Sequence, residues 1–152
     1  MKNILLSLFR NALVVILFTL NYSAFAQNPA TSIDASRYST LQQAVDALPA
    51  GGGIVILPPG NYEINKPVVI KTENTRLQGS GGSTHLINQN TSGEPAILVR
   101  ADKGTLFRLE LSGFRISGNK QSGDGIYMEK VQELMITDMT IDHNGGHGIN
   151  MK

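Results

Sequence analysis

The chain has 152 residues, a formal net charge of +1 and no cysteine. With 41% hydrophobic and 16% charged residues it is not an intrinsically disordered sequence, and its length suits one domain. A charge so close to zero, without a basic cluster, argues against nucleic acid as the partner. The absence of cysteine excludes disulfide bonds and a lipid anchor attached through a thiol.

Residues 1–26 predict a secretory signal peptide. Lys2 and Arg10 precede a nine-residue apolar run, residues 12–20, and residues 24–26 give the Ala-Phe-Ala pattern of a signal peptidase site. A membrane-spanning helix needs about twenty apolar residues, so a stable membrane anchor is the weaker interpretation. We therefore expect cleavage after Ala26 and a secreted or periplasmic protein.

A short capping helix is predicted at residues 40–48, after a polar, aperiodic segment, residues 27–38, that we expect to be a flexible lead-in. Thr40 followed by Gln43 matches a capping box. The apolar residues recur at helical spacing, which gives the helix one apolar face: Leu41, Ala44, Val45 and Leu48. The end of a solenoid is a suitable surface for that face, because terminal coils otherwise expose apolar side chains and strand edges.

The next segments predict short strands. Residues 54–57 form a continuous aliphatic run, as expected for a strand that is buried on both sides, between the cap helix and a coil. Residues 62–64, 68–70 and 76–79 follow as further strands, separated by glycine, proline and serine turns.

The C-terminal third of the chain repeats itself. Residues 125–128 return 23 positions later as residues 148–151, and the apolar pattern of residues 109–119 returns 25 positions later as residues 134–144. A period of that size indicates a solenoid, and the alternation within each run indicates strands with one face inward. Three short strands per turn predict a parallel β-helix. A leucine-rich repeat fits less well, because its consensus and its helical back side are absent.

The repeat also predicts details of the coils. Ile126 lies 29 residues after Ile97, so this coil is expected to carry extra residues in the loops at 102–104 and 120–123. Asn119, Asn144 and Gly145 are expected at bends with left-handed backbone angles. The inward side chains should be the apolar residues Ile126, Met128, Leu134, Ile136, Met139, Ile141 and Ile149.

Residues 40–48 (TLQQAVDAL) and 51–62 (GGGIVILPPGNY) resemble the N-terminal signature of the pectate lyase superfamily domain, also called the rhamnogalacturonase/epimerase-like domain. The resemblance extends over residues 39–152. It implies an all-β, right-handed parallel β-helix that acts on or binds polysaccharide, with Ca²⁺ as the cofactor of some members. The fold alone does not decide the chemistry, because such domains occur in lyases, hydrolases, epimerases and phage tail spikes.

Two outward positions are candidates for contact with sugar. With Ile126 and Met128 inward, Tyr127 points outward and lies next to Asn150 of the following coil, at a strand spacing of about 4.8 Å. A solvated surface tyrosine is the alternative interpretation. On the same face, Glu129 and Lys152 are expected to form a surface ion pair.

Asp124 and His147 are the candidates for catalysis. Residues 146–148 resemble the Gly-His-Gly of polygalacturonases, and Asp124 lies one coil earlier, so a carboxylate and an imidazole would stack. The Asp-Asp pair of that family is absent. The alternative is that both residues stabilise turns at the start of a strand.

No metal site is predicted. Asp138, Asp142 and His143 form the other dense polar group, but strand alternation places Asp138 in a turn and Asp142 at a strand end, so they need not converge on one ion.

Two classes of function remain open. The enzyme class, a lyase, hydrolase or epimerase on acidic polysaccharide, requires clustered carboxylates or basic groups, whereas the binding class, an adhesin or spike-like glycan binder, requires platforms for sugar. The last coil stops at Met151 and Lys152, within its first strand. We therefore expect a β-helix of three or four coils that is incomplete at its C-terminal end, self-associates through that open edge and lacks catalytic activity.

Overall fold

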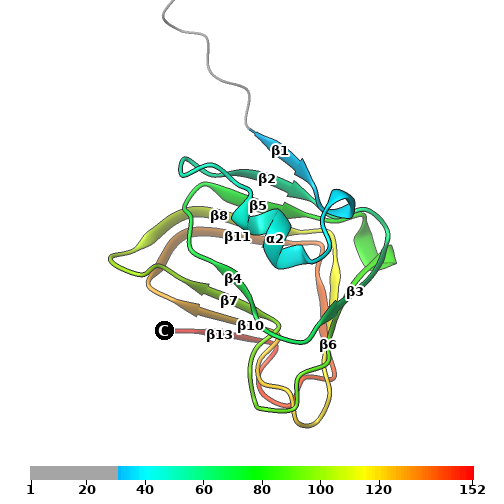
Figure 1. Cartoon of the computed structure of the whole chain (residues 1–152). Helices are drawn as coiled ribbons and strands as arrows, with labels where there is room; N and C mark the ends of the chain where they lie inside the picture. Colours follow the sequence, from blue (N-terminus) through cyan, green and yellow to red (C-terminus); the bar gives the residue numbers. More distant parts are fainter. Residues whose placement is uncertain (1–30) are drawn as a thin grey trace, which may run out of the picture.

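Short runs with every second residue apolar form the strands of this protein, whose computed structural model describes residues 31–152. The strands build three parallel sheets that enclose one interior (Figure 1). The first sheet contains β1 (Ser32–Asp34), β2 (Gly53–Ile56), β5 (Thr75–Gln78), β8 (Leu106–Ser112) and β11 (Val131–Thr137). The second contains β4 (Val68–Ile70), β7 (Ile97–Arg100), β10 (Ile126–Glu129) and β13 (Ile149–Met151). The third contains β3 (Gly60–Ile64), β6 (Thr84–Asn88), β9 (Arg115–Ser117) and β12 (Thr140–Asp142).

Each turn of the chain contributes one strand to each sheet, so the fold is a parallel β-solenoid, the predicted β-helix. The predicted offsets are confirmed, because Ile126 pairs with Ile149 and Ile97, and Leu134 pairs with Leu109. The expected extra residues of the longer coil are also confirmed. The loop from β7 to β8 contains residues 101–105, whereas the equivalent link from β10 to β11 is Lys130 alone. The loop from β9 to β10 contains residues 118–125, whereas the equivalent loop from β12 to β13 contains only residues 143–148.

The core consists of stacked rows of apolar side chains. One row runs through Val55, Leu77, Leu111 and Ile136, and another through Ile97, Ile126 and Ile149. Side chains in the middle turns are fully buried, whereas those of the last turn, such as Ile136 and Ile141, are partly buried and Ile149 is exposed. The predicted inward phase of these strands is therefore confirmed.

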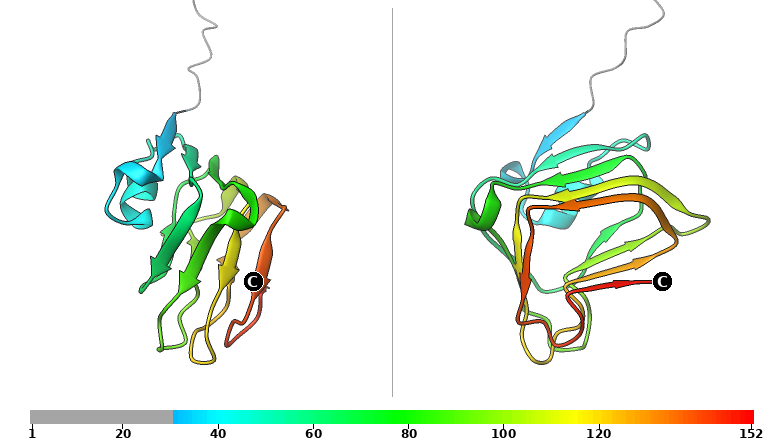
Figure 2. Two further views of the ribbon diagram at one scale, coloured as in Figure 1. Left: turned by 90° about the vertical axis from the view of Figure 1, so that its right-hand side faces the viewer. Right: turned by 180° about the vertical axis from the view of Figure 1, so that it is seen from behind.

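The cap helix lies at the N-terminal end of the solenoid (Figures 1 and 2). α2 (Leu41–Asp46) begins after Thr40, whose hydroxyl accepts a hydrogen bond from the Gln43 amide at 3.2 Å, and it buries Leu41, Ala44 and Val45. The Gln42 side chain accepts from the Val69 amide at 2.6 Å and donates to the Val69 carbonyl at 3.1 Å. It thus occupies backbone groups at the edge of β4 that another strand would otherwise pair with.

Two N-terminal segments differ from expectation. Ser32–Asp34 and Ala35–Arg37, within the segment expected to be a flexible lead-in, form β1 and the 3₁₀ helix η2, because β1 pairs in parallel with β2. β1 adds a further layer to the first sheet, so the solenoid has more turns than the three or four expected. The expectation that residues 54–57 are buried on both sides is wrong. Val55 and Leu57 are buried but Ile56 is 42% exposed, because α2 packs mainly against β4.

The left-handed backbone angles also lie elsewhere than predicted. Asn119, Asn144 and Gly145 are not among the residues with positive φ. Asn119 instead makes its turn with the side chain, which accepts hydrogen bonds from the amides of Gln121 and Ser122. Positive φ values form a column that crosses the first sheet near the start of its strands: Gly52, Asn74, Arg108 and Glu133.

The remaining short helix is the 3₁₀ helix η3 (Gly81–Ser83). No helix within residues 31–152 has the length and apolar character needed to cross a membrane. The predicted signal peptide, residues 1–26, lies outside the described residues.

Candidate functional site

Tyr127 and Asn150 lie side by side on the outer face of the second sheet, as the 23-residue offset predicts. The Tyr127 hydroxyl donates to Glu129 Oε1 at 2.8 Å, and Asn150 Nδ2 donates to Asp124 Oδ2 at 2.9 Å. The Lys152 ammonium lies 5.5 Å from the centroid of the Tyr127 ring, a cation–π distance. Both candidate side chains are half-buried and fixed by neighbours on the same face.

The expected ion pair between Glu129 and Lys152 is wrong. Glu129 Oε2 lies 3.7 Å from Nη1 of Arg100, in the preceding turn, while its other oxygen accepts from Tyr127. Glu129 lies between Arg100 of the preceding turn and Lys152 of the following turn, and it pairs with the guanidinium of Arg100. Lys152 lies over the aromatic ring instead.

Asp124 and His147 do stack, as predicted. Asp124 Oδ1 accepts from the backbone amide of His147 at 2.7 Å and lies 3.2 Å from His147 Nδ1. Burial opposes ionisation of Asp124, but the hydrogen bonds from Asn150 and from the amide and ring of His147 outweigh it and lower its pKa. Asp124 is thus a covered, ionised turn residue with both oxygens occupied, whereas the His147 side chain is 76% exposed.

Basic side chains gather at the corner between the second and first sheets. Lys71, Arg100, Glu129 and Lys152 follow one another at the ends of β4, β7, β10 and β13. The loop 101–105 adds Asp102 and Lys103, and the linker adds Lys130; an open hollow of about 360 Å³ lies among Arg100, residues 101–104, Glu129 and Lys130. Lys71 pairs with Asp102 at 2.8 Å. We call the five cations of this region, Lys71, Arg100, Lys103, Lys130 and Lys152, the basic corner.

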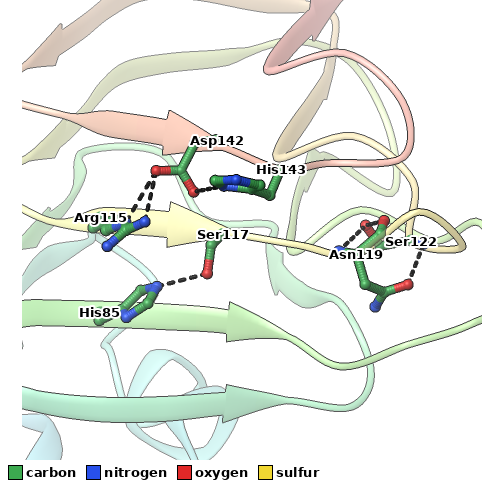
Figure 3. Close-up of polar contacts among 7 residues, drawn as sticks. All are labelled: His85, Arg115, Ser117, Asn119, Ser122, Asp142 and His143. Carbon is green, nitrogen blue, oxygen red and sulfur yellow. Dashed lines mark hydrogen bonds and ion pairs between the residues drawn. The ribbon is translucent and has the colours of Figure 1, made fainter.

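A second polar group lies on the outer face of the third sheet (Figure 3). His85 Nε2 lies 2.6 Å from Ser117 Oγ. Asp142 Oδ2 accepts from Arg115 at 2.8 and 3.1 Å, and its Oδ1 lies 2.9 Å from His143 Nδ1. The hydrogen bond with His143, together with the Arg115 guanidinium, lowers the pKa of Asp142 despite some desolvation.

The acidic residues near this group do not form a metal site. Asp138 occupies a turn between β11 and β12 with a φ of 53°, and both oxygens of Asp142 are committed to Arg115 and His143. Within residues 31–152, no three His, Asp or Glu side chains are placed to hold one ion. The group of Asp138, Asp142 and His143 therefore does not fit the Ca²⁺ that the family resemblance implies.

Sequence reasoning missed the basic corner and the contacts of His85 and Arg115. The members of the corner are far apart in the chain and adjoin acidic residues, so no local run of charge marks them. Three of them share a position in the sequence pattern. Lys71, Arg100 and Lys152 each come directly after the last inward residue of a strand of the second sheet.

The fold and surface together define a parallel β-solenoid with charged outer faces. No family model matches the chain, and no curated protein matches it. Among solved structures, ORF18 of Geobacillus virus E2 aligns with a TM-score of 0.74 at 20% sequence identity, over 78% of this chain and 27% of that one. The chain thus spans about a quarter of that viral protein, and the similarity shows the fold alone. The resemblance of residues 40–62 to the pectate lyase superfamily stays a prediction.

Proposed function

We propose that this protein binds an acidic polysaccharide along the basic corner, with Tyr127 and Asn150 as neighbouring sugar contacts. The single observation that carries the proposal is that cations from four turns gather at one edge of the solenoid. Five basic residues lie there with three acidic ones, Glu73, Asp102 and Glu129, while the whole chain is nearly neutral.

The geometry of the corner suits a polymer. Successive turns place equivalent side chains about 4.8 Å apart. Lys71, Arg100 and Lys152 share one such column, which Glu129 interrupts, and Lys103 and Lys130 lie in the links to the first sheet. Lys103 and Lys130 have no ion pair within the part of the chain that the structure describes, and both are exposed. Carboxylates of a uronic acid chain would pair with these two cations first.

Tyr127 supplies a contact of a different kind. Its hydroxyl is held by Glu129, which fixes the ring on the outer face of the sheet. Aromatic rings that are already oriented lose little conformational entropy when a ligand binds. Asn150, held by Asp124, adds an amide whose position is fixed in the same way.

The test is equilibrium binding of polygalacturonate by the wild type and by Lys103→Gln/Lys130→Gln. Exposed ion pairs contribute up to about 1 kcal/mol each, so we expect the double variant to bind roughly 5- to 25-fold more weakly. Arg37→Gln/Lys66→Gln removes the same net charge away from the corner and should bind as the wild type does. Equal weakening of both variants, or equal affinity for single-stranded DNA of the same charge, would contradict the proposal.

The contact between Asp124 and His147 raises a second candidate function, cleavage of the same polysaccharide. A glycoside hydrolase needs two carboxylates across the scissile bond, one of them protonated. Asp124 is ionised, its oxygens are occupied, and no second carboxylate contacts this pair among residues 31–152. We therefore favour binding and expect no release of reducing ends or unsaturated product. Cleavage that is lost in His147→Ala would reverse this preference.

The proposal includes export. Acidic polysaccharides of cell surfaces lie outside the cytoplasm, and residues 1–26 have the pattern of a signal peptide. A protein from the producing cell that begins at Gln27 would support export, and one that begins at Met1 would argue against it.

A further inference from the structure

The outer face of the third sheet carries an open hollow of about 480 Å³. We propose that it binds a sulfate or phosphate ester group. The hollow lies on a different sheet from the basic corner, so the inference does not depend on the proposed function. Its lining contains two basic side chains and a histidine but no carboxylate: Arg115, Ser117, Gly118, Asn119, Lys120, His143 and Asn144.

Arg115 and His143, two of the lining residues, are both held by the carboxylate of Asp142. Asp142 accepts from Nε and Nη2 of Arg115 at 3.1 and 2.8 Å through one oxygen. Its other oxygen lies 2.9 Å from Nδ1 of His143 (Figure 3). Asp142 thus positions Arg115 and His143, one through each of its oxygens.

The polar wall of the hollow is fixed as well. The Asn119 amide donates to the carbonyls of Asn88 and Asn90 and accepts from the amides of Gln121 and Ser122. The Ser117 hydroxyl is bonded to His85. Groups that are already ordered lose little entropy on binding, so an anion could be held here without reorganising the surface.

Several donors remain available. Arg115 presents N–H groups beyond the two that contact Asp142. Lys120 is exposed and forms no ion pair within residues 31–152. His143, which contacts Asp142 through Nδ1, gains a second donor at Nε2 when its ring is protonated.

The arrangement of these donors points to a tetrahedral oxyanion. Arg115 belongs to β9, Lys120 to the loop 118–125 and His143 to the loop 143–148. Donors that come from three different segments suit a tetrahedral group, whose oxygens point in several directions. A planar carboxylate has only two oxygens and suits them less well.

The experiment is a titration of the ¹⁵N-labelled chain, at constant ionic strength and about pH 6, with inorganic sulfate, inorganic phosphate, glucose 6-sulfate and acetate. We expect saturable amide shifts at residues 115–120 and 142–144 with the first three, and weaker shifts with acetate. Tighter binding of glucose 6-sulfate than of inorganic sulfate would identify a sulfated sugar as the ligand. Equal affinities would identify the free anion.

Two variants separate a site from general attraction of anions. Lys120→Gln should weaken sulfate binding roughly fivefold. Lys103→Gln, with the same charge change at the basic corner, should leave the shifts at residues 115–120 unchanged. Equal effects of the two variants, or shifts that do not saturate and spread over the surface, would overturn the proposal.

Discussion

Truncation of Leu111 tests the inward rows of the solenoid. Leu111 is 1% exposed and lies between Leu77 and Ile136 in neighbouring turns, with no room for the strands above and below to collapse. Leu111→Ala removes three buried carbons and leaves a cavity, which typically lowers the free energy of unfolding by about 2–5 kcal/mol. For a domain of this size that corresponds to a fall in Tm of roughly 8–20 °C.

The matched control is Met135→Ala. Met135 lies on the neighbouring strand β11 but points outward and is 55% exposed, so its truncation should change the free energy of unfolding by less than about 0.5 kcal/mol. Urea unfolding followed by circular dichroism measures both variants, and the slope with denaturant should be unchanged. If Met135→Ala destabilised the protein as much as Leu111→Ala, the assigned strand phase would be wrong.

Three further predictions follow from local contacts. A Cβ on Gly79 would clash with the Gly113 carbonyl oxygen, so Gly79→Ala should lower Tm clearly, whereas Gly82→Ala, with no atom within 4 Å of its Cβ, should not. Gln42→Ala leaves the Val69 amide without its side-chain partner, so hydrogen exchange at Val69 should become faster and the free energy of unfolding should fall by about 1 kcal/mol. Gln43→Ala, on the exposed side of α2, should change neither. The lowered pKa of Asp124 stabilises the fold at neutral pH, and this contribution is lost as pH falls through that pKa, below 3.8. The stability difference between wild type and Asp124→Asn should therefore disappear in acid, and a difference independent of pH would refute the assignment.

The repeat made much of the fold predictable. Because side chains in a strand alternate, one correct offset fixes the inward phase of a whole strand and its partner one turn away. The offsets of 23 and 25 residues therefore predicted the pairing of β10 with β13 and of β8 with β11. β1 has only three residues, Ser-Ile-Asp, and acquires its strand structure from pairing with β2, so no local pattern marked it.

The site was less predictable than the fold. The strand register predicts which side chains lie in one column, but it does not predict which neighbour in the column each side chain contacts. Glu129 had cations on both sides, and only the three-dimensional structure decides between Arg100 and Lys152. His85 on β6 contacts Ser117 on β9. Their separation of 32 residues differs from the repeat offsets of 23 and 25, so the repeat does not predict this contact. Asp124 and His147 were predictable because they share the 23-residue offset.

The most direct test of the central claim is to map amide shifts of the ¹⁵N-labelled chain during titration with a galacturonic acid oligosaccharide. Binding along the basic corner predicts the largest shifts at Lys103, Lys130, Tyr127 and Asn150, diminished as salt increases because exposed ion pairs are screened. Shifts confined to the first sheet, or no saturable shifts at low salt, would contradict it.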